Sequence, residues 1–243
     1  MTSAYSDVYQ SWRKAPLDFW RAAAQAIDWI KPPDKIFDPE AGVYGHWFPD
    51  ATCNTAFNCV DRHVNAGCGA QTAIIYDSPV TGAKRKVSYA ELLDQTRRLA
   101  GVLRGMGVAK GDRVIIYMPM VPEAVTAMLA CARIGAVHSV VFGGFAAKEL
   151  ATRIDDAKPK LILAANCGIE PGRIVEYLPL LSEAVALSAH KPEGCLVLHR
   201  AQSAQRASSS FARDWDEAME DARVSGVSAD CAELKAKIGR AHV

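Results

Sequence analysis

The sequence predicts an α/β fold in which a mostly parallel sheet is flanked by helices and preceded by an aromatic-rich helical arm. Three runs rich in β-branched and aliphatic residues, at 113–117, 138–142 and 160–164, alternate with two stretches of helical spacing. This β-α-β-α-β order makes parallel strands the default arrangement. Four of the five tryptophans fall within the first fifty residues, which sets the arm apart from the remainder.

Within the arm, residues 4–14 and 17–30 have helical character and precede the proline-rich turn KPPDK at 31–35. We interpret the arm as a non-repetitive segment that wraps onto a larger body. A free-standing helical module is the alternative, but the aromatic side chains are too many for so short a core.

Residues 54–66 have helical spacing and carry Asp61, Arg62 and His63. These three side chains invite a catalytic interpretation, but a polar helix face or a buried structural pair is favoured. The six histidines of the chain are scattered, so a metal site is not expected.

A hairpin and a long helix are predicted next. Strands at 72–77 and 83–87 flank a turn that contains a proline and a glycine. The motif Ser88-Tyr89-Ala90-Glu91 is a capping box, which announces the start of a helix. That helix carries an apolar stripe and is expected to stop near Gly107.

The order of the strands predicts a ligand site at one edge of the sheet. Gly143-Gly144 follows the second strand of the central run, and the GIEPGR turn at 168–173 follows the third. Since parallel strands point the same way, both turns leave from carboxyl ends, where open α/β sheets bind ligands. Glycines admit a ligand close to the backbone, and Arg173 offers a planar fork of donors suited to phosphate. An anionic ligand is therefore expected at this edge.

The carboxyl-terminal third has a weaker pattern. Residues 173–187 are helical but broken by Pro179, and 195–200 form a further strand. Residues 201–210 are a low-complexity loop that is expected to be mobile. Residues 211–224 are expected to form a short helix, and nothing after it is expected to build another strand.

Composition bounds the class of protein. The 28 Lys and Arg residues nearly balance the 27 Asp and Glu residues, so no overall field attracts nucleic acid or an acidic membrane. The seven cysteines include no CxxC pair, which suggests a reducing compartment. No apolar run reaches membrane-spanning length, and the N-terminus has neither a signal peptide's apolar core nor an Arg-rich transit pattern. A cytoplasmic protein is expected.

Five stretches resemble the AMP-forming acyl-CoA synthetases, in the short-chain branch that contains acetyl- and propionyl-CoA synthetases. The stretches are YQSWRKAPLDFW, NTAFNCVDRHV, KVSYAELL, GDRVIIYMPMVPEAVTAMLACARIGAVHSVVFGGF and GIEPGR. The resemblance implies an N-terminal arm of acetyl-CoA-synthetase type at 1–53. It implies the first part of the AMP-binding, or adenylate-forming, domain at 54–237. Residues 238–243 do not look like family sequence.

The resemblance implies a reaction in two halves that uses ATP, CoA and Mg. A carboxylate attacks ATP to give an acyl-adenylate and pyrophosphate, and the thiol of CoA then displaces AMP. Matching positions imply that seven residues bind the 3′-phosphoadenosine part of CoA: Phe142, Gly143, Gly144, Glu170, Pro171, Gly172 and Arg173. No residue of this chain is assigned a catalytic or metal-binding role.

The GIEPGR turn departs from the acetyl-CoA synthetases. Those enzymes have an arginine where this chain has Glu170, and a carboxylate beside phosphate is repulsive unless it points away or pairs with Arg173. The Glu-Pro-Gly-Arg form looks more like propionyl-CoA synthetases, which favours propionate. A type II turn centred on Pro171 and Gly172 is the purely structural interpretation, and it is compatible with a ligand role.

A larger departure concerns activity. The family's Ser/Thr/Gly-rich phosphate loop and its small C-terminal domain have no counterpart in the sequence. The chain is therefore expected to be a truncated propionate–CoA ligase that is itself inactive and binds no cofactor tightly. An acetate–CoA ligase fragment and a non-catalytic CoA-binding or interaction module are the alternatives. A dinucleotide-binding enzyme is disfavoured because no GxGxxG follows any strand. The expected partners are small molecules only, and the oligomeric state stays open.

Overall fold

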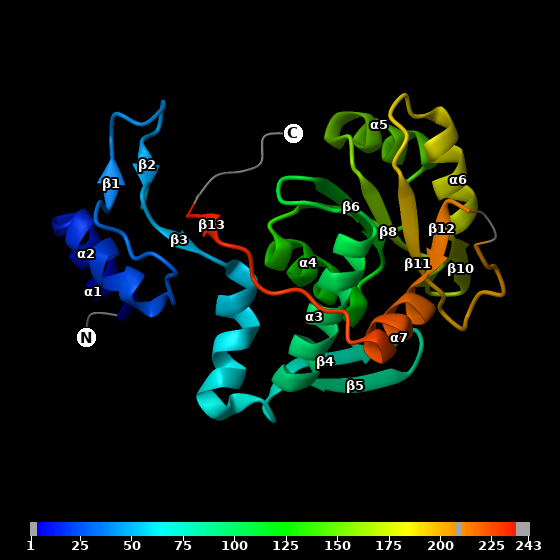
Figure 1. Cartoon of the computed structure of the whole chain (residues 1–243), viewed down its shortest axis with the longest axis horizontal. Coiled ribbons are helices and arrows are strands. Elements are labelled where there is room, and N and C mark those ends of the chain that lie inside the picture. Colours follow the sequence, from blue (N-terminus) through cyan, green and yellow to red (C-terminus); the bar gives the residue numbers. More distant parts are fainter. Residues whose placement is uncertain (1–3, 208–209, 237–243) are drawn as a thin grey trace. The chain divides into compact units, whose positions relative to one another are not determined.

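The computed structural model describes residues 4–207 and 210–236, and these divide into two compact units. One unit contains residues 4–54 together with 233–236, and the other contains the described residues from 55 to 232 (Figure 1). The predicted tail at 238–243 lies outside the described residues. The predicted division into an N-terminal arm at 1–53 and an adenylate-forming domain from 54 stays a prediction.

The smaller unit is built around a few aromatic side chains. Helices α1 (Ala4–Lys14) and α2 (Pro16–Ala23) lead through a 3₁₀ turn, η1 (Ala24–Ala26), to a hairpin of β1 (Phe37–Asp38) and β2 (His46–Trp47). Its core is small and consists of Ala24, Ile36, Phe48 and Ala51, against which Trp29 and Trp47 pack. The indole of Trp29 donates a hydrogen bond of 2.8 Å to the carbonyl of Ala24.

The last described strand corrects one expectation from the sequence. Strand β13 (Leu234–Lys235) pairs antiparallel with β3 (Thr52–Cys53), although no strand was predicted after residue 224. The hydroxyl of Thr52 donates a 2.7 Å hydrogen bond to Glu233, and the N–H of Ala236 donates to the carbonyl of Ala51. Two residues are too few to show the alternation of apolar and polar side chains that predicts a strand, so β13 is recognised only by its pairing with a distant strand.

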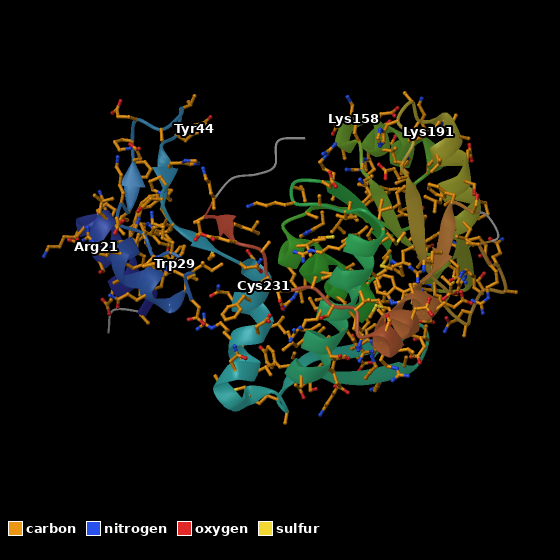
Figure 2. All side chains as sticks on the ribbon, in the orientation of Figure 1. Arg21, Trp29, Tyr44, Lys158, Lys191 and Cys231 are labelled. Carbon is orange, nitrogen blue, oxygen red and sulfur yellow. The ribbon has the colours of Figure 1, made fainter. Side chains whose placement is uncertain are left out.

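Many apolar side chains of the smaller unit face solvent. Helix α1 has no buried residue. Tyr44 lies in the turn between β1 and β2, and 92% of its surface is exposed (Figure 2).

The larger unit contains a five-stranded parallel sheet, which confirms the predicted α/β class. The strands are β6 (Arg113–Met118), β7 (Val137–Phe142), β8 (Leu161–Ala165), β11 (Gly194–Leu198) and β12 (Ala212–Asp214). Their spatial order is β12-β11-β8-β6-β7, and every adjacent pair is parallel. The three strands predicted in the central run are each placed within one residue.

Helices cover both faces of this sheet. The chain moves from β6 to β7 in one direction and from β7 back past β6 to β8 in the other. Right-handed crossovers therefore put α4 (Pro122–Ile134) and α5 (Ala147–Ala157) on opposite faces. Helix α3 (Tyr89–Gly105) packs against α4 and α7 (Trp215–Ser225), whereas α5 packs against α6 (Tyr177–Leu187) (Figure 1).

Local signals in the sequence explain how α3 begins. It follows the hairpin of β4 (Thr72–Ser78) and β5 (Ala83–Ser88). Both bonds of the predicted capping box are present: the N–H of Glu91 donates to the hydroxyl of Ser88, and the N–H of Ser88 donates to the Glu91 carboxylate at 2.7 Å. The N–H of Ser88, together with its hydroxyl, which donates to the same carboxylate oxygen at 2.8 Å, lowers the pKa of Glu91.

The predicted helix at 173–187 is wrong in its first turn. Residues Arg173–Glu176 form strand β10, which pairs antiparallel with β9 (Cys167–Glu170). Helix α6 begins only at Tyr177, so Pro179 is its third residue and does not break it. Because the first N–H groups of a helix have no partner within the helix, a proline in this turn removes no helical hydrogen bond.

A buried ion pair joins two segments of the larger unit. The Arg133 guanidinium on α4 donates to both carboxylate oxygens of Asp61, at 2.8 and 3.0 Å, and to the carbonyl of Ala229 at 2.6 Å. The side chains of Arg133 and Asp61 are only 3% and 12% exposed. Asp61 lies in η2 (Phe57–Asp61), a π-helical turn, and it forms a buried structural pair, one of the two non-catalytic interpretations that the sequence favoured.

We expect Arg133→Met to lower the free energy of unfolding by about 3–5 kcal/mol, because it leaves the Asp61 carboxylate buried and unpaired. Arg98→Met is the matched control, since the side chains of the Arg98–Asp94 pair within α3 are 25% and 51% exposed and surface pairs contribute about 0–1 kcal/mol. Denaturant unfolding of both variants measures the difference. Equal, small losses would show that the buried pair contributes no more than a surface pair.

Candidate ligand site at the carboxyl edge of the sheet

The two turns predicted to bind a ligand lie at the same edge of the sheet. Gly143-Gly144 directly follows β7, and the β9–β10 hairpin follows β8 after the single residue Asn166. A hollow of about 300 Å³ lies at this edge, and three of the predicted residues, Phe142, Gly143 and Glu170, help to line it. Its other walls are residues 76–80, at the end of the 72–78 strand and the start of the following turn, the loop at 119–121, and Ile169, Tyr177 and Arg200.

The remaining predicted residues lie beside the hollow. Pro171, Gly172 and Arg173 form the exposed tip of the β9–β10 hairpin and do not line it. Gly144 is exposed, with a φ of +96° that favours glycine. The structure thus places all seven predicted residues at one edge, in two adjacent turns.

Gly143 has a different reason to be glycine. It is buried, and a Cβ at this position would lie 2.6 Å from Cε2 and from Cζ of Tyr177, closer than real Cβ atoms come. Gly168, in β9, meets the other side of the same ring, with a Cβ position 2.6 Å from Cζ and 2.9 Å from Cε1. The space next to these two glycines is filled by a side chain of the protein.

Two tyrosines hold the Gly143-Gly144 turn. The phenol oxygen of Tyr117, on β6, accepts a 3.2 Å hydrogen bond from the N–H of Gly144 and donates one of 3.1 Å to the carbonyl of Phe145. The rings of Tyr117 and Tyr177 lie 5.0 Å apart. Burial raises the pKa of Tyr117, and it raises that of Tyr177 to about 12. Both phenols are therefore neutral at physiological pH.

The hairpin tip carries the charged groups of the site. Residues 170–173 form a two-residue turn in which Gly172 has a φ of +79°, as the third position of a type II turn requires. Nε and Nη2 of Arg173 both lie 2.7 Å from Oε2 of Glu170. These side chains are 70% and 48% exposed, so the pair is weak and Arg173 can exchange Glu170 for another anion.

Two polar residues of the edge were not identified from the sequence. Asn166 is fully buried; its Nδ2 donates to the carbonyls of Arg200 and Gln205, each at 3.2 Å, and its Oδ1 accepts from the N–H of Arg200 at 2.8 Å. Nη1 of Arg200 donates to the carbonyl of Cys167. These bonds fix the start of the loop that was expected to be mobile. A polar residue directly after the apolar strand 161–165 was the available signal.

Neither a metal-ligand cluster nor a membrane-spanning helix is present in the residues that the structure describes. No group of three or more His, Cys, Asp or Glu side chains in this part of the chain could hold a metal. Of the helices that the structure describes, none is long and apolar enough to cross a bilayer.

Two family models match the chain and together cover most of it. The model described as "AMP-binding enzyme" matches residues 60–233. The model described as "Acetyl-coenzyme A synthetase N-terminus" matches residues 5–59.

Curated relatives extend the similarity. The chain is 50% identical over 209 residues to acyl-CoA synthetase short-chain family member 3, mitochondrial, of Bos taurus, covering 86% of this chain and 30% of that protein. It is 45% identical over 180 residues to acetyl-coenzyme A synthetase of Streptomyces coelicolor, covering 74% of this chain and 28% of that protein. The chain therefore spans about a third of the length of these relatives.

A solved structure has the same fold. Acetoacetyl-CoA synthetase from Streptomyces lividans superposes with a TM-score of 0.79 over 98% of this chain and 35% of its own length. The sequences are 21% identical, so this likeness concerns the fold alone.

Proposed function

The chain belongs to the AMP-binding enzyme family, and from this premise we propose that it is part of a ligase that joins a short-chain carboxylate to CoA. Its resemblance to AMP-forming short-chain acyl-CoA synthetases is borne out by both family models and by the relatives. The observation that carries the proposal is identity of 45–50% to such synthetases over 74–86% of the chain. In the proposed reaction ATP activates the carboxylate as an acyl-adenylate, and the CoA thiol then displaces AMP.

This chain's part in the reaction is to bind CoA. In our proposal the 3′-phosphoadenosine portion lies against the Gly143-Gly144 turn and the β9–β10 hairpin. The Arg173 guanidinium exchanges Glu170 for the 3′-phosphate, whose higher charge makes the new pair stronger. Phe142, which is 64% exposed, offers an apolar ring beside the same turn.

Propionate is the proposed carboxylate. The support is the Glu-Pro-Gly-Arg sequence at 170–173, which looks more like propionyl- than acetyl-CoA synthetases. Acetate is the second candidate, because acetyl-coenzyme A synthetases are also among the relatives.

ATP and Mg are proposed for the whole enzyme and not for the residues described above. No group of three or more His, Cys, Asp or Glu side chains among the described residues could hold a metal ion, so no residue of this chain is proposed as a Mg ligand. A cytoplasmic location stays a prediction, and the mammalian relatives are named as mitochondrial.

The activity is tested by comparing the 243-residue chain with the full-length ligase that the proposal implies. We expect the full-length enzyme to form thioesters with a kcat/KM for propionate above those for acetate and butyrate. We expect the 243-residue chain to catalyse no carboxylate-dependent pyrophosphate exchange, because it contains no phosphate loop to stabilise the charge that develops on ATP. Pyrophosphate exchange by the 243-residue chain above a protein-free blank would contradict the proposal that this chain is inactive alone. A higher kcat/KM for acetate in the full-length enzyme would make acetate the substrate in place of propionate.

Arg173 gives a sharper test of the CoA site. A charge-assisted hydrogen bond contributes about 1.5–3 kcal/mol, so Arg173→Ala in the full-length enzyme should raise the KM for CoA roughly 10- to 150-fold. Pyrophosphate exchange needs no CoA and should be nearly unchanged. Dephospho-CoA, which lacks the 3′-phosphate, should be used about equally by mutant and wild type.

Arg213→Ala is the matched control, since Arg213 is also an exposed arginine in an ion pair, with Asp221, but lies on β12. It should leave the KM for CoA unchanged. If Arg173→Ala lowers exchange and thioester formation equally, Arg173 only ties down the hairpin and leaves the set of CoA ligands.

A further inference from the structure

The two turns that form the proposed CoA site have no direct hydrogen bond to one another among the described contacts. What lies between them is Tyr177, the first residue of α6, which is 4% exposed. Its backbone N–H donates a 2.8 Å hydrogen bond to the carbonyl of Asn166, at the end of the neighbouring strand β8. Because Tyr177 directly follows β10 and Asn166 directly precedes β9, this bond closes the base of the hairpin and holds the ring there, against the Gly143-Gly144 turn.

The ring of Tyr177 sets how close the two turns can come. Gly143, in one turn, and Gly168, in the hairpin, both press on it so closely that neither position could carry a Cβ. Gly144 makes ordinary contact with the same ring, at 3.8 Å from the Cβ position to Cε1. Loss of the ring would remove most of the packing between the two turns and leave Val175 of β10, whose Cγ1 lies 3.9 Å from the Cβ position of Gly144.

Few other restraints act on the Gly143-Gly144 turn. It follows β7, which lies at the edge of the described sheet and pairs with β6 alone. Beyond that ladder, the turn is held by the Tyr117 hydrogen bond to Gly144, and the Tyr117 ring itself rests 5.0 Å from that of Tyr177. Both tyrosines thus restrain the turn, and of the two it is Tyr177 that also contacts Gly168 in the hairpin.

We propose that Tyr177 is a positioning residue that fixes the spacing between the Gly143-Gly144 turn and the β9–β10 hairpin and so sets the affinity for CoA. This inference rests on the proposed function. Tyr177 acts through the turns and not by contact with reacting atoms. A ligand that bridges the two turns binds well only if their spacing is preset, because otherwise binding must also order them.

The test uses three variants of the full-length ligase. Tyr177→Ala removes the ring, Tyr177→Phe keeps it, and Leu181→Ala is the matched control. Leu181 lies one turn further along α6 and is 5% exposed, but it lines a different hollow, between α6 and β11. Thermal unfolding, pyrophosphate exchange and the KM for CoA are measured for each variant.

We expect Tyr177→Ala to raise the KM for CoA by about 10-fold, because binding must then also order the two turns, while pyrophosphate exchange changes less than about twofold. Tyr177→Phe should restore the wild-type KM. Leu181→Ala should lose comparable thermal stability without raising the KM, which separates positioning from a general loss of packing.

A second measurement tests the contact itself. Gly143→Ala should lower the melting temperature strongly in the wild-type background and much less in the Tyr177→Ala background, because the added methyl then has room. Equal losses in both backgrounds would overturn the proposed contact.

Different results would overturn the proposed function and the role of Tyr177. If the wild-type enzyme forms no thioester, the proposed function fails and the inference fails with it. If the wild type is active and Tyr177→Ala leaves the KM for CoA unchanged, or lowers both half-reactions together, only the role of Tyr177 is overturned.

Discussion

The burial of strand β6 is the constraint on which the larger unit depends. Every residue from Val114 to Met118 is buried, and the strand pairs in parallel with β7 on one side and β8 on the other. A strand of this kind needs apolar cover on both faces, which α4 and α5 supply from opposite sides. With helices on both faces, the chain turns back after β7 and passes β6 to reach β8, so the switch point lies between β6 and β8. Such a reversal opens a crevice at the carboxyl ends of the strands. The position of the candidate site follows from how the core is buried.

Packing also decides what the glycines of the site do. The sequence suggests that Gly143 and Gly144 leave room for a ligand near the backbone. In the structure Gly144 meets the demand of a positive φ, whereas Gly143 leaves room for the ring of Tyr177. The two adjacent glycines thus have two physical causes: Gly144 supplies a positive φ, and Gly143 leaves room for an aromatic ring. The proposed CoA site is shaped by a tyrosine that no motif singles out.

What could be predicted from the sequence was local. The strand 113–117, the Ser88 capping box and the Pro171-Gly172 turn each carry their signal within a few residues. Pairing across long separations carries no such signal. The ion pair between Asp61 and Arg133 spans 72 positions, and only the general expectation of a structural pair could be stated.

The site could be predicted in place but not in detail. The two turns come together because parallel strands end at the same edge of the sheet, and the strand directions could be predicted. The pairing of Arg173 with Glu170 could be stated as one of two options, since residues at this spacing can meet across a tight turn. Tyr177 could not be identified, because an aromatic residue at the start of a helix resembles any core residue. The effect of Pro179 could not be predicted either, because it depends on the residue at which α6 begins.

A crystal structure of the full-length ligase with CoA bound tests the central claim most directly. The account predicts the 3′-phosphate within hydrogen-bonding distance of the Arg173 guanidinium, with the Arg173–Glu170 pair opened. It also predicts the Tyr177 ring unmoved between Gly143 and Gly168. A 3′-phosphate bound elsewhere, with the Arg173–Glu170 pair intact, would contradict the assignment of this edge to CoA.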